Sequence, residues 1–194
     1  MKHAVIFAHP NDKSFTATLA AAYCDAAQSR GHGAITRDLY GIGFDPCLKR
    51  EEIPGQPDFG PKPDVMAERA LISDADVFAL FYPLWLNAPP AILKGYLDRV
   101  FGFGFAYRHG SGGIEPALSG RKLVTFSASG APFEWVRKSG AWDAMHKLFD
   151  EHFAAVCGLE LIDHMHFGGI VPGIRKDFVE SCANSVREVV RKHF

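Results

Sequence analysis

Five short apolar runs recur along the chain, and segments with helical periodicity separate them. Each run has the length of a β-strand, and the one at 76–82, "DVFALFY", is almost continuously hydrophobic. Such continuity is typical of a strand that is buried on both faces. The predicted strands are 3–8, 33–40, 76–82, 121–129 and 159–167.

The segments between these runs carry the signals of amphipathic helices. In the first, Phe15, Leu19 and Tyr23 share one helical face, Ser14 suits the N-cap, and Gly31 suits the stop after the last turn. Further helices are predicted over 65–75, over 89–103 with two prolines at its start, over 141–158 and over 176–194.

Strands that alternate with helices predict an α/β fold with a parallel sheet covered on both faces. Residues 41–64 are rich in Pro, Gly and charge, so we expect an irregular excursion with one short helical turn and a single domain over 1–194. Ligands of such sheets bind beyond the C-terminal ends of the strands, where the strand order reverses. In the order 2-1-3-4-5 that point lies between strands 1 and 3, so the loops after strands 1, 3 and 4 matter most.

Composition narrows the class of protein without identifying it. The 194 residues are 47% hydrophobic and 22% charged with a net charge of −1, so no global field favours nucleic acid or an anionic membrane. No apolar run reaches the roughly 20 residues of a membrane helix. The four cysteines are scattered and form no CxxC pair, which favours reduced thiols, a cytoplasmic location and no metal knuckle.

The loop "AHPNDKSFT" joins the first strand to the first helix. A helix N-terminus offers unpaired N–H groups and a partial positive charge, and Ser14, Thr16, His9 and Lys13 add polar contacts. The loop therefore resembles a phosphate cradle, although it lacks the GxGxxG and GxxxxGK[ST] patterns. The alternative is a Ser-capped helix with incidental polar neighbours.

The loop "PLWLNAPP" follows the third strand, where small polar turn residues are usual. Its three prolines fix φ and remove donors, so the loop is predicted to be rigid. A rigid loop with Trp85 and Leu86 suits a wall against a planar ring system. The alternative is that Trp85 caps the core, but the loop lies at the predicted switch point and beside the phosphate cradle.

The loop "SASGAPFEW" follows the fourth strand, and its small residues let the backbone approach a ligand closely. Ser127 and Ser129 offer hydroxyls to ring nitrogens or oxygens, while the alternative is an ordinary turn. A phosphate site at the first loop and a flat-ring site at the other two together predict a flavin, which would supply the hydride chemistry.

The chain resembles the flavodoxin-like NAD(P)H:quinone oxidoreductases. The resemblance rests on "AHPNDKSFTATL", "DLYGIGFDP", "PLWLNAPPAILKGYLDRVF", "GFAY" and the "SASG" turn, in the order of the family. It implies a flavodoxin-like three-layer sandwich with strand order 2-1-3-4-5. It also implies a homodimer with two interfacial flavin sites, FAD or else FMN, and two-electron reduction of a quinone by NADPH or NADH in a ping-pong scheme.

The resemblance also assigns roles to residues of this chain. His9, Ser14, Phe15 and Thr16 would hold the flavin phosphate. Pro83, Leu84, Trp85 and Leu86 would line the isoalloxazine, with Ser129 and Gly130 at its other edge. Tyr107 of "GFAY" would cover the substrate space from the partner subunit.

The sequence departs from the family where the proton on the reduced flavin is handled. Eukaryotic members have a Tyr and a His after the fourth-strand turn, but Phe133, Trp135 and Val136 occupy that region here. His109 or His146 is the candidate to replace them, because histidine titrates near neutral pH. The alternative for both is a surface or structural role.

Two other patterns carry weaker predictions. His164 and His166 share one face of the fifth strand, but no third ligand accompanies them, so we expect no metal site. Lys94, Asp98 and Arg99 are expected to form a solvated or salt-bridged helix face.

Other functions on this scaffold remain open at this point. They are an azo- or nitro-compound reductase, a flavin-bearing regulatory subunit of a potassium-efflux system, and a one-electron flavodoxin carrier. A carrier is usually strongly acidic, which this chain is not.

Overall fold

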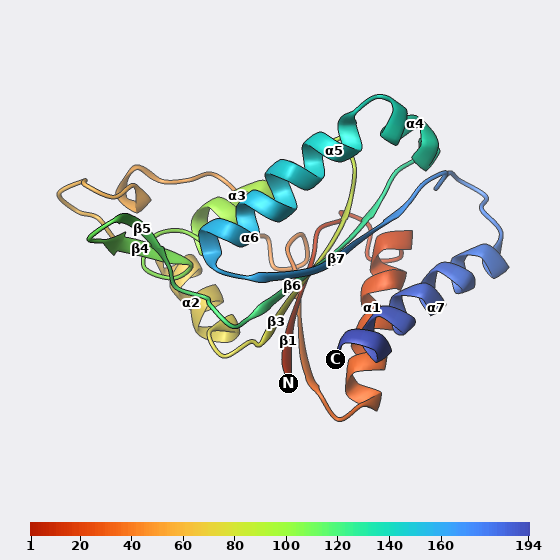
Figure 1. Cartoon of the computed structure of the whole chain (residues 1–194), viewed down its shortest axis with the longest axis horizontal. Helices are drawn as coiled ribbons and strands as arrows, with labels where there is room; N and C mark the ends of the chain where they lie inside the picture. The colour runs from red at the N-terminus through yellow and green to blue at the C-terminus, as the bar shows by residue number, and fades with distance from the viewer.

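The computed structural model describes all residues from 1 to 194 and contains one five-stranded parallel sheet (Figure 1). The sheet order is β2-β1-β3-β6-β7, which is the predicted 2-1-3-4-5 when only these strands are counted. Neighbouring strands pair in parallel throughout. The strands are β1 (Lys2–Phe7), β2 (Gly33–Asp38), β3 (Val77–Pro83), β6 (Lys122–Ala128) and β7 (Glu160–Phe167).

Helices cover both faces of this sheet and make three layers. The helices α1 (Phe15–Ser29) and α7 (Lys176–His193) lie on one face (Figure 1). The opposite face packs against α2 (Pro63–Ile72), α3 (Ala91–Val100) and α6 (His152–Cys157). All seven residues of β3 are buried, as expected for a central strand between two helical layers.

One predicted helix is interrupted by a stretch of wider turns. Residues 141–158 form α5 (Ala141–Met145), the π-helix η2 (His146–Glu151) and α6 in sequence. A π-helix is rare and often marks a functional site, and sequence periodicity does not reveal it. Gly158 ends the helix in the left-handed conformation, as its position predicted.

Two elements lie outside the predicted pattern. Tyr107–Gly110 (β4) and Gly113–Pro116 (β5) form a two-stranded antiparallel hairpin that projects from the body (Figure 1). The segment Phe133–Lys138 forms the short helix α4, where only a loop was expected. Both are too short to show a clear period in the sequence.

The excursion at 41–64 is irregular with one short helical turn, η1 (Arg50–Glu52), as predicted. The buried side chain of Arg99 holds this excursion in place. The guanidinium of Arg99 donates to both carboxylate oxygens of Glu52 at 2.8 and 2.9 Å and to those of Asp64 at 2.7 and 3.0 Å. The prediction of a solvated or salt-bridged face is confirmed for the surface pair Lys94–Asp98 and for the ion pairs of Arg99, but Arg99 itself is buried, with 2% exposure.

We expect Arg99→Met to lower the free energy of unfolding by roughly 3–5 kcal/mol, because it leaves Glu52 buried without a counter-charge. Urea unfolding at pH 7 measures this. The control is Arg108→Met, whose ion pair with Glu115 is exposed and contributes at most about 1 kcal/mol.

The stability difference between the natural protein and Arg99→Met should also depend on pH. Burial alone would raise the pKa of Glu52, but the hydrogen bonds from Arg99 lower it, and they lower the pKa of Asp64 as well. Depressed carboxyl pKa values stabilise the fold above the unfolded pKa of about 4, and this contribution disappears as the pH falls. The stability gap between the natural protein and Arg99→Met should therefore shrink below about pH 4.

Candidate active site

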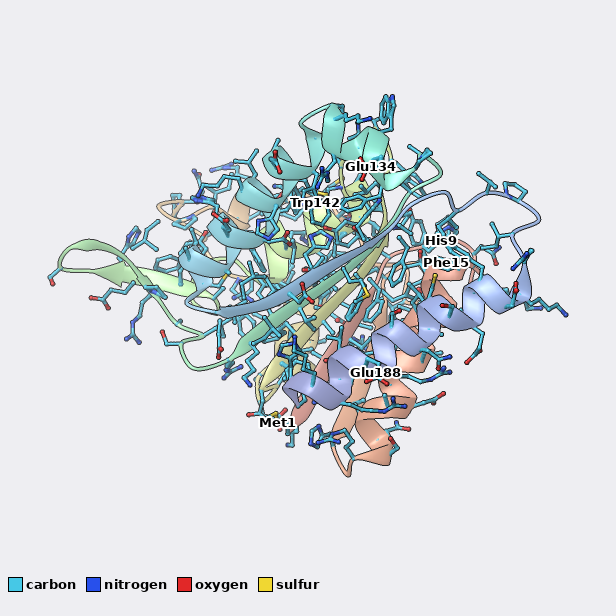
Figure 2. All side chains as sticks on the ribbon, turned by 45° about the vertical axis from the view of Figure 1, so that its right-hand side comes forward. Met1, His9, Phe15, Glu134, Trp142 and Glu188 are labelled. Carbon is cyan, nitrogen blue, oxygen red and sulfur yellow. The ribbon has the colours of Figure 1, made fainter.

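A cleft of about 460 Å³ opens at the C-terminal edge of β1, β3 and β6. It brings together the three loops that the sequence singled out, since His9, Ser14, Trp85 and Ser129 all line it. His9 and Phe15 lie next to each other at the N-terminal end of α1 (Figure 2). The switch-point prediction therefore locates a real hollow in the surface.

One end of the cleft is the N-terminus of α1. Ser14 caps this helix as predicted, and its Oγ accepts from the N–H of Ala17 at 3.1 Å. The hydroxyl hydrogen of Ser14 stays free to donate. The N–H groups of Phe15 and Thr16 have no partner inside the helix, because they belong to its first turn. This end of the cleft thus presents donors, which suits an anion.

His9 adds one more neutral donor to that end. His9 Nδ1 accepts from the N–H of Asn11 at 3.0 Å and also lies 3.2 Å from the carbonyl oxygen of Asn11; the N–H contact is the shorter one and favours the tautomer with the proton on Nε2. Burial lowers the pKa of His9, so the ring is uncharged near neutral pH. No lysine or arginine lines the cleft, and Lys13, a candidate cation in the sequence, is exposed outside it.

The loop after β3 is a tight hairpin. Trp85 and Ala88 exchange two backbone hydrogen bonds of 2.9 and 3.1 Å, and Leu86 and Asn87 between them have φ values of 53° and 57°. Left-handed conformations at residues other than glycine cost energy and are concentrated at functional sites. Pro89 and Pro90 follow at once, and Pro90 is the N-cap of α3, so two residues with fixed φ join the hairpin to the helix.

This hairpin separates two residues that the sequence grouped. Trp85 lines the cleft, is 45% exposed, and has its ring 6.1 Å from that of His9. Leu86 is fully exposed at the hairpin tip and does not line the cleft. Pro83 and Leu84 line it with Trp85, so three of the four expected wall residues meet in one chain.

The far wall of the cleft is formed by the loops after β6 and β7, which are joined by backbone hydrogen bonds. The N–H of Ser129 donates to Phe167 O, that of Ile170 to Ser129 O, and that of Gly169 to Ala131 O, each at 2.9 Å. Gly168 allows this approach, because a Cβ there would lie 2.3 Å from the backbone nitrogen of Phe133. The loop after β6 is therefore held in place by the loop after β7.

The loop after β7 forms part of the cleft wall, which the sequence analysis did not predict. Ile170, Val171, Pro172 and Ile174 line the cleft beside Ser129 and Gly130. The available signal was the topology, because the loop after the fifth parallel strand emerges at the same edge of the sheet as the others.

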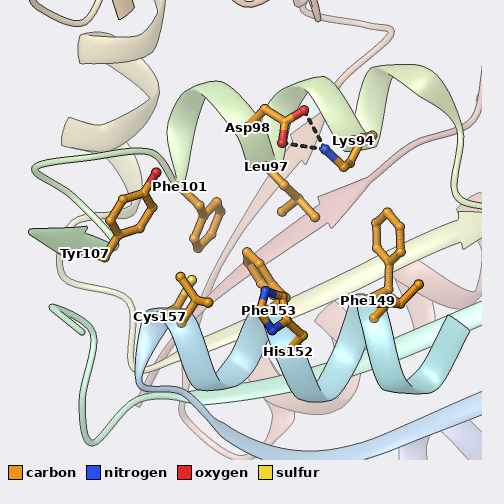
Figure 3. Close-up of a pocket in the computed structure, with 11 residues that line it drawn as sticks. Lys94, Leu97, Asp98, Phe101, Tyr107, Phe149, His152, Phe153 and Cys157 are labelled. Carbon is orange, nitrogen blue, oxygen red and sulfur yellow. Dashed lines mark hydrogen bonds and ion pairs between the residues drawn. The ribbon is translucent and has the colours of Figure 1, made fainter. Parts of the chain in front are cut away.

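The three candidate catalytic residues lie elsewhere in the chain. Tyr107 borders a groove of about 250 Å³ in which side chains of α3 face those of η2 and α6 (Figure 3). His109 lies on the exposed hairpin with its ring 4.9 Å from Phe103. His146 begins η2, where its Nδ1 lies 3.4 Å from Glu151. None of the three lines the cleft of its own chain.

The two strand histidines also have protein partners. His164 and His166 share one face of β7, as predicted, and both bond to the hydroxyl of Ser127, at 2.7 and 2.8 Å. No group of three or more His, Cys, Asp or Glu side chains in the structure is arranged to hold a metal ion. No helix is long and apolar enough to cross a membrane.

Known proteins resemble this chain over most of its length. An uncharacterized NAD(P)H oxidoreductase of Haemophilus influenzae is 34% identical, over 88% of this chain and 85% of its own. NAD(P)H dehydrogenase [quinone] 1 of Rattus norvegicus is 24% identical over 82% of this chain, which spans 65% of the length of the rat protein. The solved NAD(P)H:quinone oxidoreductase of Methanothermobacter marburgensis superposes with a TM-score of 0.86 at 28% identity, covering 100% of this chain and 98% of the other.

The family model described as flavodoxin-like fold matches residues 1–190. The chain belongs to the flavodoxin-like fold family.

Proposed function

We propose that this protein is a flavin-dependent NAD(P)H:quinone oxidoreductase that works as a homodimer. The observation that carries the proposal is the cleft, which joins an anion-binding helix N-terminus to a rigid aromatic wall. The similar proteins whose names include NAD(P)H and quinone support the same activity.

The donors of the cleft fit a flavin phosphate at one end. The first-turn N–H groups of α1, the Ser14 hydroxyl and His9 Nε2–H supply neutral donors to a phosphate, with the helix dipole favouring its charge. Thr16 borders the same end of the cleft and adds a hydroxyl. These residues bind and orient the cofactor and take no part in the electron transfer.

The walls of the cleft fit a planar ring at the other end. Trp85 and Leu84 offer apolar surface, while the 129–131 turn offers backbone edges and the Ser129 hydroxyl region. When bound, the flavin accepts a hydride from NAD(P)H and passes two electrons to a quinone. The protein's part is to hold the ring, keep water from one face and leave the other face open to both substrates.

We keep FAD as the proposed cofactor with FMN as the alternative. Residues 41–64 would favour FAD over FMN if they covered an adenosine. None of those residues lines the cleft, and Arg99 holds them against α2 and α3, so that argument has no counterpart within one chain. Retention after desalting decides between the two.

The direct test is an absorption spectrum of protein incubated with FAD or FMN and then desalted. We expect one flavin to be retained, to bleach in one step with NADPH or NADH without oxygen, and to recover on addition of a quinone. A protein that retains neither flavin would overturn the proposal. A long-lived one-electron intermediate during bleaching would favour a carrier instead.

We expect Trp85→Ala to weaken flavin retention more than Ser14→Ala does. The tryptophan change removes ring-stacking area and leaves the backbone hydrogen bonds of the hairpin in place, whereas the serine change removes one cap and one donor, about 1 kcal/mol. Fluorescence titration measures both dissociation constants. Full retention by Trp85→Ala would show that the loop after β3 is not the ring site.

The proposed homodimer uses the groove between α3 and α6. It is lined mostly by apolar side chains, and Leu148 beside it is 65% exposed. A second copy seated there would remove this surface from water and bring the partner subunit close to Tyr107, which borders the groove. The substrate space would then be completed only in the dimer.

Leu148→Glu should convert the dimer to a monomer, because it places a charge in that interface. Light scattering measures the molar mass. The control is Leu71→Glu on α2, which is similarly exposed outside the groove and should leave the dimer intact. A dimer that survives Leu148→Glu would place the interface elsewhere.

A further inference from the structure

A continuous chain of hydrogen bonds leads from the protein interior to the cleft. Asp150 Oδ2 lies 2.6 Å from His164 Nδ1, and His164 Nε2 lies 2.7 Å from Ser127 Oγ. The same hydroxyl lies 2.8 Å from His166 Nδ1, and His166 Nε2 lies 2.9 Å from Ser129 Oγ. Ser129 Oγ donates to the carbonyl of Ala131 at 2.8 Å, and Ser129 lines the cleft. None of the proposed ligand-binding roles uses the first four members of this chain.

The chain is buried between β6, β7 and the helical layer above them. Asp150 and Ser127 are each 1% exposed, and the side chain of His164 has no exposure. The ring of Trp142 covers both histidines at 4.8 and 5.8 Å, and Figure 2 places it over the sheet. Ser127, in the middle of the chain, is therefore shielded from water and finds its partners in the two histidines, of which His166 is half-buried.

The ionisable groups around His164 come from several elements. Tyr82 of β3 lies with its ring 6.2 Å away, and His146 of η2 lies 6.5 Å away. His166 is on the same strand. Asp143, Lys147, Glu151 and Asp163 border the open pocket of about 550 Å³ that also touches His164. Only Asp150 forms a carboxylate contact with the ring of His164.

Counting donors along the chain locates its protons. The hydroxyl hydrogen of Ser129 goes to a carbonyl, which can only accept, so His166 must donate to Ser129 through Nε2–H. His166 Nδ1 is then an acceptor and receives the hydroxyl hydrogen of Ser127. Ser127 Oγ must in turn accept from His164 Nε2–H, and the Asp150 carboxylate accepts from His164 Nδ1–H.

The count places a hydrogen on Nε2 of both histidines. The Asp150–His164 contact holds one further hydrogen, which lies on His164 Nδ1 because a carboxyl group is a stronger acid than an imidazolium. His164 is therefore the imidazolium partner of a buried ion pair with Asp150. The neutral state of His166 agrees with its pKa, which burial, helped by the neighbouring His164 charge, lowers to about 4. One extra proton is stored at the inner end of the chain, and the three hydrogen bonds from His164 Nε2 to Ser129 Oγ are oriented toward the cleft.

We propose that the Asp150–His164 pair is a stored proton source that serves the cleft through Ser127, His166 and Ser129. This inference rests on the proposed function, because it assigns the group that compensates the charge created by hydride transfer. It replaces His109 and His146, the candidates from the sequence, neither of which lines the cleft. Asp150 and His164 act as positioning residues, since only Ser129 reaches the ligand space.

The transfer balances with one proton moved over four steps. A hydride carries one hydrogen and two electrons from NAD(P)H, so the group that accepts it gains one negative charge. His164 Nε2–H passes to Ser127 Oγ, the Ser127 hydrogen to His166 Nδ1, the His166 Nε2 hydrogen to Ser129 Oγ, and the Ser129 hydrogen to the acceptor in the cleft. His164 ends neutral, His166 ends as the other tautomer, and both serines keep one hydrogen each.

The first experiment uses the flavin-free protein. Imidazole nitrogen NMR should show His164 protonated at both nitrogens at pH 7 and His166 protonated at Nε2 alone. Asp150→Asn, which keeps the shape and the hydrogen bond but removes the charge, should return His164 to a neutral ring. A neutral His164 in the natural protein would overturn the proposal, whatever the protein's activity.

The second experiment measures how fast bound flavin is reduced by NADPH in a single turnover without oxygen. Proton transfer by a positioned group contributes about 10²-fold or more to rates. We therefore expect Asp150→Asn and Ser127→Ala each to slow reduction by about 10- to 100-fold and to change its solvent deuterium isotope effect, with flavin affinity unchanged. Ser127→Ala breaks the chain without removing a charge, so it covers the case in which Asp150→Asn folds poorly.

The matched control is Glu151→Gln. Glu151 is the next carboxylate in the sequence and also contacts a histidine, His146, but on the surface. It should leave reduction unchanged. Unchanged rates and isotope effects in Asp150→Asn and Ser127→Ala would overturn the relay while leaving the oxidoreductase assignment intact. Failure of the natural protein to bind any flavin would overturn the proposed function, and the NMR result would still report on the stored proton.

Discussion

Burial of the central sheet on both faces is the constraint on which the rest of the structure depends. Because β3 and β6 have helices above and below them, no ligand reaches the middle of either strand. Polar chemistry is confined to the C-terminal edge, where the strands end and the loops begin. A polar side chain farther back has only protein groups as possible partners, and Ser127 finds two of them in His164 and His166.

The buried charges of Arg99 and His164 are compensated in different ways. Arg99 is surrounded by two carboxylates and a backbone carbonyl, so its charge is fully compensated and it joins distant segments of the chain. His164 has one carboxylate partner, and its second N–H points along a chain of neutral groups to the cleft. The first arrangement has no route to a ligand and stabilises the fold. The second has such a route, which is why only this one supports an inference about chemistry.

Local signals in the sequence predicted most of the fold. The strands, the Ser14 cap and the Gly158 stop follow from short-range patterns, the strand order follows from the family resemblance, and the cleft follows from the switch-point rule. The wall from 170 to 174 and the short helix α4 depend on packing between loops that are far apart in the chain. Arg99 was misjudged for the same reason, because its partners lie in the irregular excursion and in α2.

The proton chain was beyond prediction because it depends on register. The pairing of β6 with β7 shifts by one residue between Leu123 and Val124, which places His166 opposite Ser127. Without the shift, Met165 would take that position. Asp150 depends on a second irregularity, since it lies in the π-helical stretch that interrupts a regular helix. A histidine pair in a strand is visible in the sequence, but its partners are set by these two local departures from regular geometry.

The charges around the cleft are distributed unequally, and this bears on what the site favours. The end of the cleft at the N-terminus of α1 has only neutral donors and a helix dipole, since no lysine or arginine lines the cleft. The formal positive charge near the site lies on His164, behind the turn that holds Ser129. Neutral donors bind a phosphate equally in both redox states of a cofactor. A cation behind the opposite end of the cleft interacts more strongly with the redox state of a bound cofactor that carries more negative charge there. It therefore favours reduction of the cofactor more than binding of the oxidised cofactor.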